Sequence, residues 1–183
     1  INLEIGMTPT QLLDEIRATA RVWAETNGVD LAANTNPLYV RAVVSRGDGD
    51  LGLDPRKCPA AKVVIIVDRI KLYPKELYET GLTLVTTAIR RNLPDALPPQ
   101  IKSLNYLCNI LAKLDANRQG AAEAVFLNHM GYVAEATADN LFIVSRGVVI
   151  TPPVNDGALP GITREAVLEL AATLGIPSRE DHV

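Results

Sequence analysis

The sequence is poor in the residue types that build metal sites and disulfide frameworks. It contains 2 cysteines and 2 histidines among 183 residues. Cys58 and Cys108 form neither a disulfide framework nor a ligand cluster, so nothing indicates a secreted, disulfide-held protein. His129 and His182 have no neighbour at metal-ligand spacing. We therefore expect no metal site.

The sequence also lacks a large excess of positive or negative charge, and it has no long apolar run. The formal net charge is -3, whereas a protein that binds nucleic acid generally needs a basic face. No apolar run approaches the length of a membrane span, so we expect neither nucleic acid nor a membrane as a partner. No signal peptide is visible, and the expected location is cytoplasmic.

Two motifs that would indicate a hydrolase or an ion site are incomplete. There is no Gly-x-Ser-x-Gly elbow, so a Ser/His/Asp triad is unsupported. The Gly- and Asp-rich stretch 46–52 lacks the terminal Glu of a calcium loop and the Lys-Ser/Thr that closes a phosphate loop. From these residues alone, it is expected to be a surface connection.

The composition, with 48% hydrophobic and 21% charged residues, is that of a globular protein with one domain or two small ones. Expected strands cluster and helices are added at intervals without regular βαβ alternation, which favours an α+β fold. The β-branched run 61–67 is typical of a central strand. Helices are expected between Thr8 and Gly28 and over 103–120 and 163–174, and strands over 38–45, 61–67, 81–90, 122–127, 132–135, 140–145 and 148–151.

Two turn and cap signals are strong. Thr8 can cap the first helix, Pro9 suits its first position, and Gln11 completes a capping box. Arg146-Gly147 is the expected turn of the last hairpin.

The chain is expected to form two domains, 1–72 and 81–183, joined by a linker at 73–80. The stretch around this linker is mixed in composition and contains proline. Ile1 leads directly into a helix signal, and Val183 follows shortly after the start of a further expected strand. Both ends therefore look cut from something longer.

The helix expected over 103–120 follows a proline pair and carries apolar residues at helical spacing. Lys102 stands at its start, and Tyr106 follows four residues later. If the helix includes Lys102, an amine and a phenol share one face, one turn apart. An amine buried there would have a lowered pKa and could form a Schiff base, but most such lysines are solvated. Both alternatives stay open on these residues alone.

Two further features could complete a site around this lysine. Glu135 ends a short strand and enters a small polar turn, where a carboxylate is usually only a turn residue. Gly161, Ile162 and Thr163 lead into a helix whose free N–H groups could bind phosphate, although an ordinary N-cap is the simpler interpretation. An amine, a carboxylate and a helix N-terminus are together what pyridoxal 5'-phosphate needs, because they hold its aldehyde, its ring nitrogen and its phosphate.

Separated motifs in order along nearly the whole chain resemble a known family. The segments that resemble the signature of fold-type IV aminotransferases are Ile-Lys-Ser-Leu-Asn-Tyr at 101–106, Gly-Tyr-Val-Ala-Glu at 131–135 with Asp-Asn-Leu-Phe at 139–142, and Leu-Pro-Gly-Ile-Thr-Arg at 159–164. The segments that resemble branched-chain amino acid aminotransferases in particular are Tyr-Val-Arg at 39–41 and the loop 46–58.

The resemblance implies a cofactor role for each site residue. Lys102 would be the Schiff-base lysine and would move a proton between the substrate Cα and the cofactor C4′. Glu135 would pair with the pyridine nitrogen, and Tyr106 would hydrogen-bond the phenolic oxygen. Leu159 would pack on the ring, and the helix start at 161–163 would hold the phosphate.

The resemblance also implies substrate and subunit contacts. Tyr39 and Arg41 would belong to the substrate pocket, with Arg41 serving the distal carboxylate of glutamate or 2-oxoglutarate. The loop 46–53 would reach the active site of a partner subunit, so a homodimer is implied.

Family members are longer at both ends. The resemblance implies that 1–72 is the C-terminal part of a small domain and that 81–183 is the N-terminal part of a large cofactor-binding domain. The missing flanks would carry an arginine and a loop that bind the phosphate. Family members also usually have glycine where Ala136 and Ala138 stand here, and alanine would be strained at a position that needs positive φ.

The implied function is transamination of leucine, isoleucine and valine with 2-oxoglutarate as amino acceptor, through pyridoxal 5'-phosphate. The alternatives are a D-amino acid aminotransferase or an aminodeoxychorismate lyase of the same fold. A catalytically inactive fragment is the alternative from a different class.

Overall fold

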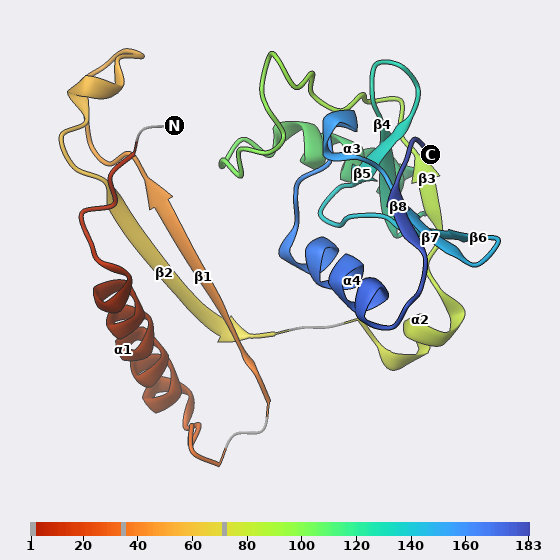
Figure 1. Cartoon of the computed structure of the whole chain (residues 1–183). Coiled ribbons are helices and arrows are strands. Elements are labelled where there is room, and N and C mark those ends of the chain that lie inside the picture. Colours follow the sequence, from red (N-terminus) through yellow and green to blue (C-terminus); the bar gives the residue numbers. More distant parts are fainter. Residues whose placement is uncertain (1–2, 34–35, 71–72) are drawn as a thin grey trace. The chain divides into compact units, whose positions relative to one another are not determined.

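The computed structural model describes residues 3–33, 36–70 and 73–183. The chain divides into two compact units, Ile1–Tyr73 and Pro74–Val183, each with its own sheets (Figure 1). The expected linker contains helix α2 (Lys75–Thr80). The two predicted domains and their boundaries stay a prediction.

The helix of the first unit begins and ends where its caps predict. In α1 (Pro9–Asn27), Thr8 Oγ1 accepts a 3.2 Å hydrogen bond from the Gln11 backbone N–H. Gln11 Oε1 in turn accepts from the Thr8 backbone N–H at 2.8 Å, which closes the capping box. The helix ends at Gly28, whose φ of 62° lies in the left-handed region that favours glycine.

Replacing Thr8 with alanine is expected to destabilise the first unit by about 1 kcal/mol, because the Gln11 backbone N–H loses its acceptor. Trp23 is the only tryptophan and lies in α1, so its fluorescence during urea unfolding follows this unit. Thr10→Ala removes a hydroxyl from the same first turn and is the matched control. An equal loss in both variants would argue against the cap as the cause.

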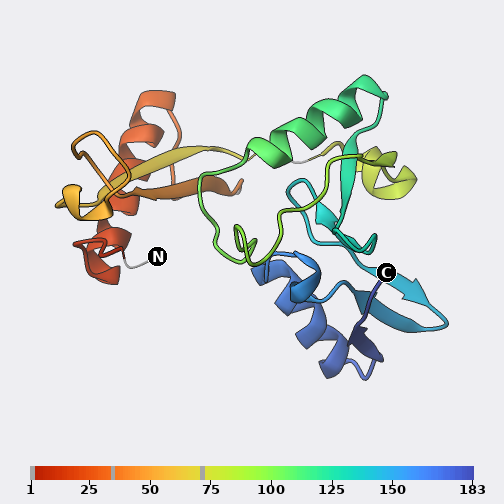
Figure 2. The same cartoon turned by 90° about the horizontal axis from the view of Figure 1, so that it is seen from above.

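The sheet of the first unit has two strands. β1 (Leu38–Ser45) and β2 (Lys62–Arg69) are antiparallel and in register from end to end. Burial alternates along β2, with Val67 buried and Val64 and Ile66 exposed, so only one face is covered. Helix α1 packs on β2 (Figures 1 and 2). The prediction of a central strand is wrong for this chain, because β2 pairs with β1 alone among the described strands.

Two three-stranded sheets build the second unit, in the orders β3-β4-β5 and β6-β7-β8. The outer pairs β3/β4 and β7/β8 are parallel, and the hairpins β4/β5 and β6/β7 are antiparallel. The strands are β3 (Leu84–Thr86), β4 (Glu123–Leu127), β5 (Val133–Ala136), β6 (Ile143–Ser145), β7 (Val148–Thr151) and β8 (Ser178–Glu180).

Helices connect the parallel pairs. Helix α3 (Leu107–Arg118) leads from β3 to β4, and α4 (Ile162–Thr173) leads from β7 to β8. Both predicted hairpins are confirmed, and the turn of the second has Arg146 and Gly147 at φ 51° and 78°, as a two-residue turn requires. The strand expected over 81–90 is shorter, because only β3 pairs. The α+β class is confirmed, with these two βαβ connections added.

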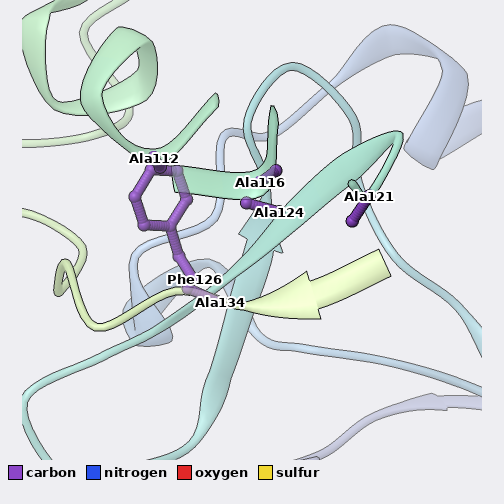
Figure 3. Packing of buried hydrophobic residues seen from close by; sticks show 6 residues of the cluster. All are labelled: Ala112, Ala116, Ala121, Ala124, Phe126 and Ala134. Carbon is purple, nitrogen blue, oxygen red and sulfur yellow. The ribbon is translucent and has the colours of Figure 1, made fainter. Parts of the chain in front are cut away.

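The core of the second unit consists mostly of small side chains (Figure 3). Phe126 is fully buried and supplies the single large ring of the cluster. The half-buried side chain of Cys108 packs against the same cluster. The other buried members are Ala112, Ala116, Ala121, Ala124 and Ala134.

The helix expected over 103–120 begins later than predicted. Helix α3 starts at Leu107, and both Lys102 and Tyr106 precede it. The condition under which an amine and a phenol would lie on one helical face, one turn apart, is therefore not met.

Tight turns take the place of the first helical turn. Ile101 N–H donates to Pro98 O, and Ser103 N–H donates to Ile101 O at 2.7 Å. The second bond spans two residues and closes a γ-turn, whose backbone is not helical. The Ser103 hydroxyl also accepts from Asn105 N–H, which is how a short polar side chain competes with helix formation.

Candidate active site

One pocket in the second unit gathers four of the predicted cofactor residues. Lys102, Tyr106, Glu135 and Leu159 all line it. They come from the segment before α3, from β5 and from the loop before α4, which contains the short helix η2 (Val154–Asp156). The other polar residues that line it are Arg91, Asn92, Ser103, Asn105, Asn109 and Thr137.

Lys102 is exposed although it lines this pocket. The alternative of a buried amine is therefore wrong for this chain, because the tight turns before α3 leave Lys102 outside the core. Burial raises the pKa of the Glu135 carboxyl group, and the charge of Lys102 is one of the smaller effects that oppose this rise.

Glu135 is a buried carboxylate with partners on both oxygens. Oε1 lies 2.6 Å from Arg91 Nη2. Oε2 accepts from the Leu159 backbone N–H at 2.9 Å and from Asn140 Nδ2 at 3.4 Å. Burial raises the pKa of Glu135, and the Leu159 N–H and the Arg91 charge oppose this rise.

Arg91 is the partner that holds Glu135. Its Nε donates to Gly157 O at 3.0 Å, and its guanidinium lies 5.5 Å from the centre of the Phe126 ring. Gly157 has φ 105°, and a Cβ there would lie 2.9 Å from Arg91 Cγ. Gly157 therefore provides the carbonyl that accepts from Arg91, and its lack of a Cβ leaves room for the Arg91 side chain.

The start of α4 does not line the Lys102 pocket. Gly161 is the N-cap, no side chain caps this helix, and Ile162 and Thr163 are exposed. Arg164 is buried and pairs with Glu180 at 2.6 Å, so it ties the first turn of α4 to β8. The phosphate role of this helix start stays a prediction.

The two predicted substrate residues lie in the first unit. Tyr39 and Arg41 are on β1, and both side chains are exposed. The loop after β1 is held by ion pairs of Asp48 with Lys62 and of Asp50 with Lys57. This loop also presents Leu51, which is almost fully exposed.

The described part of the chain holds no group of three or more His, Cys, Asp or Glu residues that could bind a metal ion. His182 instead has Nδ1 2.7 Å from Asp156 Oδ2, and its ring stacks on Tyr132. No described helix has the length and apolar character that crossing a bilayer requires.

Comparison with known proteins places this chain in a family. Residues 1–183 match the sequence profile of the family described as amino-transferase class IV. The chain belongs to this family. A relative from Methanocaldococcus jannaschii is 43% identical over 179 residues, which are 98% of this chain and 58% of the relative.

Solved structures agree with this membership. The branched-chain amino acid aminotransferase of Escherichia coli is 31% identical with a TM-score of 0.83, covering 99% of this chain and 57% of that one. The T.th. branched-chain amino acid aminotransferase with pyridoxamine 5'-phosphate is 29% identical with a TM-score of 0.83, covering 99% and 56%. The class IV aminotransferase chain thus spans little more than half the length of these relatives.

The two alanines that replace family glycines are not strained in this class IV aminotransferase chain. Among the described non-glycine residues, only Arg146 has positive φ. The turn 136–139 is closed by the Ala136 N–H donating to Asp139 O at 2.9 Å. Thr137 within it donates to Glu123 Oε1 at 2.6 Å. Alanine at 136 and 138 is therefore compatible with the backbone of this turn.

Sequence reasoning missed two residues of the candidate site in this class IV aminotransferase chain. Arg91 stands at the start of a breaker-rich loop, and nothing local distinguishes it from a solvated arginine. Asn140 falls in a family segment, at 139–142, but the motif alone indicates no role for it. A buried charge pair cannot be inferred from one local motif, because the partner of Glu135 comes from a distant part of the sequence.

Proposed function

We propose that this chain is part of a pyridoxal 5'-phosphate-dependent aminotransferase that moves amino groups between branched-chain L-amino acids and 2-oxoglutarate. The observation that carries the proposal is the pocket in which Lys102 and Glu135 occur together, with Arg91 on the carboxylate. Branched-chain substrates are favoured because the structural relatives reported above are branched-chain amino acid aminotransferases.

The polar groups of the pocket fit this cofactor. An ionised carboxylate has about four acceptor positions. In Glu135, Arg91 takes one on Oε1, while the Leu159 N–H and Asn140 Nδ2 take both on Oε2. One position on Oε1 remains, and it suits the N–H of a protonated pyridine ring. Arg91 supports this role because its charge favours the ionised carboxylate.

When bound, the cofactor supplies an aldehyde that condenses with amines and a ring that withdraws electrons from the substrate Cα. Lys102 Nζ would hold the aldehyde and later move the proton between Cα and C4′. Tyr106 would donate to the phenolic oxygen, and Leu159 would pack on the ring. Glu135 would keep the ring nitrogen protonated.

The other ends of cofactor and substrate have proposed partners too. The N–H groups at Gly161, Ile162 and Thr163 would bind the phosphate at the start of α4. Tyr39 would line the substrate pocket, and Arg41 would bind the distal carboxylate of glutamate or 2-oxoglutarate. A homodimer is part of the proposal, with the loop 46–53 near the partner's site.

Borohydride trapping tests the cofactor half of the proposal. The chain mixed with pyridoxal 5'-phosphate and reduced is expected to carry the label on Lys102, located by peptide mass spectrometry. Lys102→Arg keeps the charge but cannot form the bond, so its label at 102 is expected to vanish. Lys75→Arg, on the exposed side of α2, is the control and should label normally. A wild-type chain without label at Lys102 would contradict the proposal.

Transamination assays with different amino donors test the substrate half of the proposal in the same preparation. Transfer from L-leucine to 2-oxoglutarate is expected to exceed transfer from D-alanine. Turnover of D-alanine alone would point to a D-amino acid aminotransferase instead. A labelled chain that turns over neither amino acid would limit the proposal to cofactor binding.

A further inference from the structure

Asn140 closes a ring of hydrogen bonds beside Glu135. Its Nδ2 donates to Leu159 O at 2.9 Å and lies 3.4 Å from Glu135 Oε2. Leu159 N–H donates to the same Glu135 oxygen at 2.9 Å. Both backbone groups of Leu159 are therefore fixed, one by the carboxylate and the other by the amide.

The other side of the Asn140 amide faces the start of α4. A Cβ built on Gly161 would lie 2.3 Å from Asn140 Oδ1, closer than real Cβ contacts come. Because Leu159 O holds the amide in place, Oδ1 could not yield freely to such a side chain. Gly161 is the N-cap of α4 and has an ordinary φ of -76°, so the close approach, and not the backbone conformation, favours glycine there.

We propose that Asn140 is a positioning residue that holds Glu135 and the N-terminus of α4 at a fixed separation. This inference rests on the proposed function, in which Glu135 meets the ring nitrogen and α4 meets the phosphate. One amide then sets the separation between the partners of the ring nitrogen and the phosphate, which belong to a single small ligand.

The elements on either side of Asn140 are anchored by other residues. Arg91 holds Glu135 and Gly157, and Arg164 holds the first turn of α4 to Glu180. The short segment between these anchors contains Leu159 and Gly161. Without the Asn140 amide, Leu159 keeps its N–H bond to Glu135 but its carbonyl loses its partner, so the chain between Leu159 and Gly161 can shift relative to Glu135.

Comparing pyridoxal 5'-phosphate with pyridoxal isolates this effect. Pyridoxal carries the ring but no phosphate, so its binding does not depend on the separation between Glu135 and the start of α4. The half-saturating concentration for borohydride trapping on Lys102 is measured for both compounds, and their ratio gives the advantage due to the phosphate. An incompetent state in equilibrium with the folded one raises both half-saturating concentrations by the same factor and leaves their ratio unchanged, whereas irreversibly misfolded protein lowers only the maximal labelling.

In Asn140→Ala the phosphate advantage is expected to fall about tenfold. Asn140→Asp keeps the size of the side chain but removes the N–H donors, and it is expected to lose at least as much. Asn117→Ala, on the exposed face of α3, is the control and should keep the wild-type ratio.

Gly161→Ala provides a second arm, because its new Cβ would clash with Asn140 Oδ1 and force the amide or the start of α4 to move. It should lower the phosphate advantage alone, but much less in an Asn140→Ala background, since the amide is already gone. Wild-type ratios in both Asn140 variants would overturn the inference, as would full additivity of the two substitutions. Absence of trapping on Lys102 in the wild-type chain would instead overturn the proposed function.

Discussion

Replacing Arg91 with methionine is expected to destabilise the second unit by about 3–5 kcal/mol near neutral pH. The side chains of Arg91 and Glu135 are only 9% and 8% exposed. Methionine fills much of the volume but leaves the carboxylate charged and buried without its cation. Among the described residues, the other cation that acts on Glu135 is Lys102, which is exposed, while Asp139 acts in the opposite direction.

The loss should depend on pH in a defined direction. Without Arg91, burial raises the folded-state pKa of Glu135 further above the unfolded value of about 4.3. A raised carboxyl pKa contributes stability that is complete below the unfolded pKa and is lost as pH rises through the folded pKa. The deficit of Arg91→Met relative to wild type should therefore be small near pH 4 and grow toward neutral pH.

Urea unfolding followed by far-UV circular dichroism at several pH values measures this deficit. Trp23 fluorescence reports the first unit in the same samples and is the internal control, because that transition should not move. Arg91→Met/Glu135→Gln removes both charges and should recover most of the stability with little pH dependence. A deficit that is the same at every pH would show that Arg91 acts through packing alone.

Local chemistry explains which elements could be predicted. The limits of α1 follow from Thr8, Gln11 and Gly28, which act on backbone groups within one turn. The last hairpin follows from Arg146-Gly147 in the same way. The start of α3 was predicted too early, although the apolar residues do have helical spacing. Turn hydrogen bonds around Ser103 replace the first helical turn, and the spacing of apolar residues does not reveal them.

The candidate site could be predicted only for residues that their own chemistry and local motif distinguish. Lys102 and Glu135 could be singled out by their chemistry and by their motifs. Their environment could not, because it depends on partners brought by the fold. Arg91 reaches Glu135 only when the loop after β3 lies against β5, and Asn140 gains a role only when Leu159 and Gly161 return to it.

Phe126→Ala is expected to cost the second unit about 3–5 kcal/mol, toward the upper end of that range. The cost of such a truncation depends on how well neighbours can fill the cavity. Here the buried neighbours are alanines (Figure 3), and the larger side chains packed against the cluster, Val85, Ile89 and Cys108, are only partly buried. The alanine side chains have no torsion that could swing a methyl group into the space. The ring also lies against the Arg91 guanidinium, so its loss removes a cation–π contact as well.

Phe126→Leu separates these two contributions. Leucine restores most of the apolar volume but offers no ring face to Arg91, so its loss should stay below about 1.5 kcal/mol. Urea unfolding by circular dichroism, with Trp23 fluorescence as the unchanged reference, measures both variants. If Phe126→Leu costs as much as Phe126→Ala, the ring face toward Arg91 matters more than the filled volume. The hydrophobic core and the charge pair of the site would then be one cooperative structure, and trapping on Lys102 should weaken in parallel with stability.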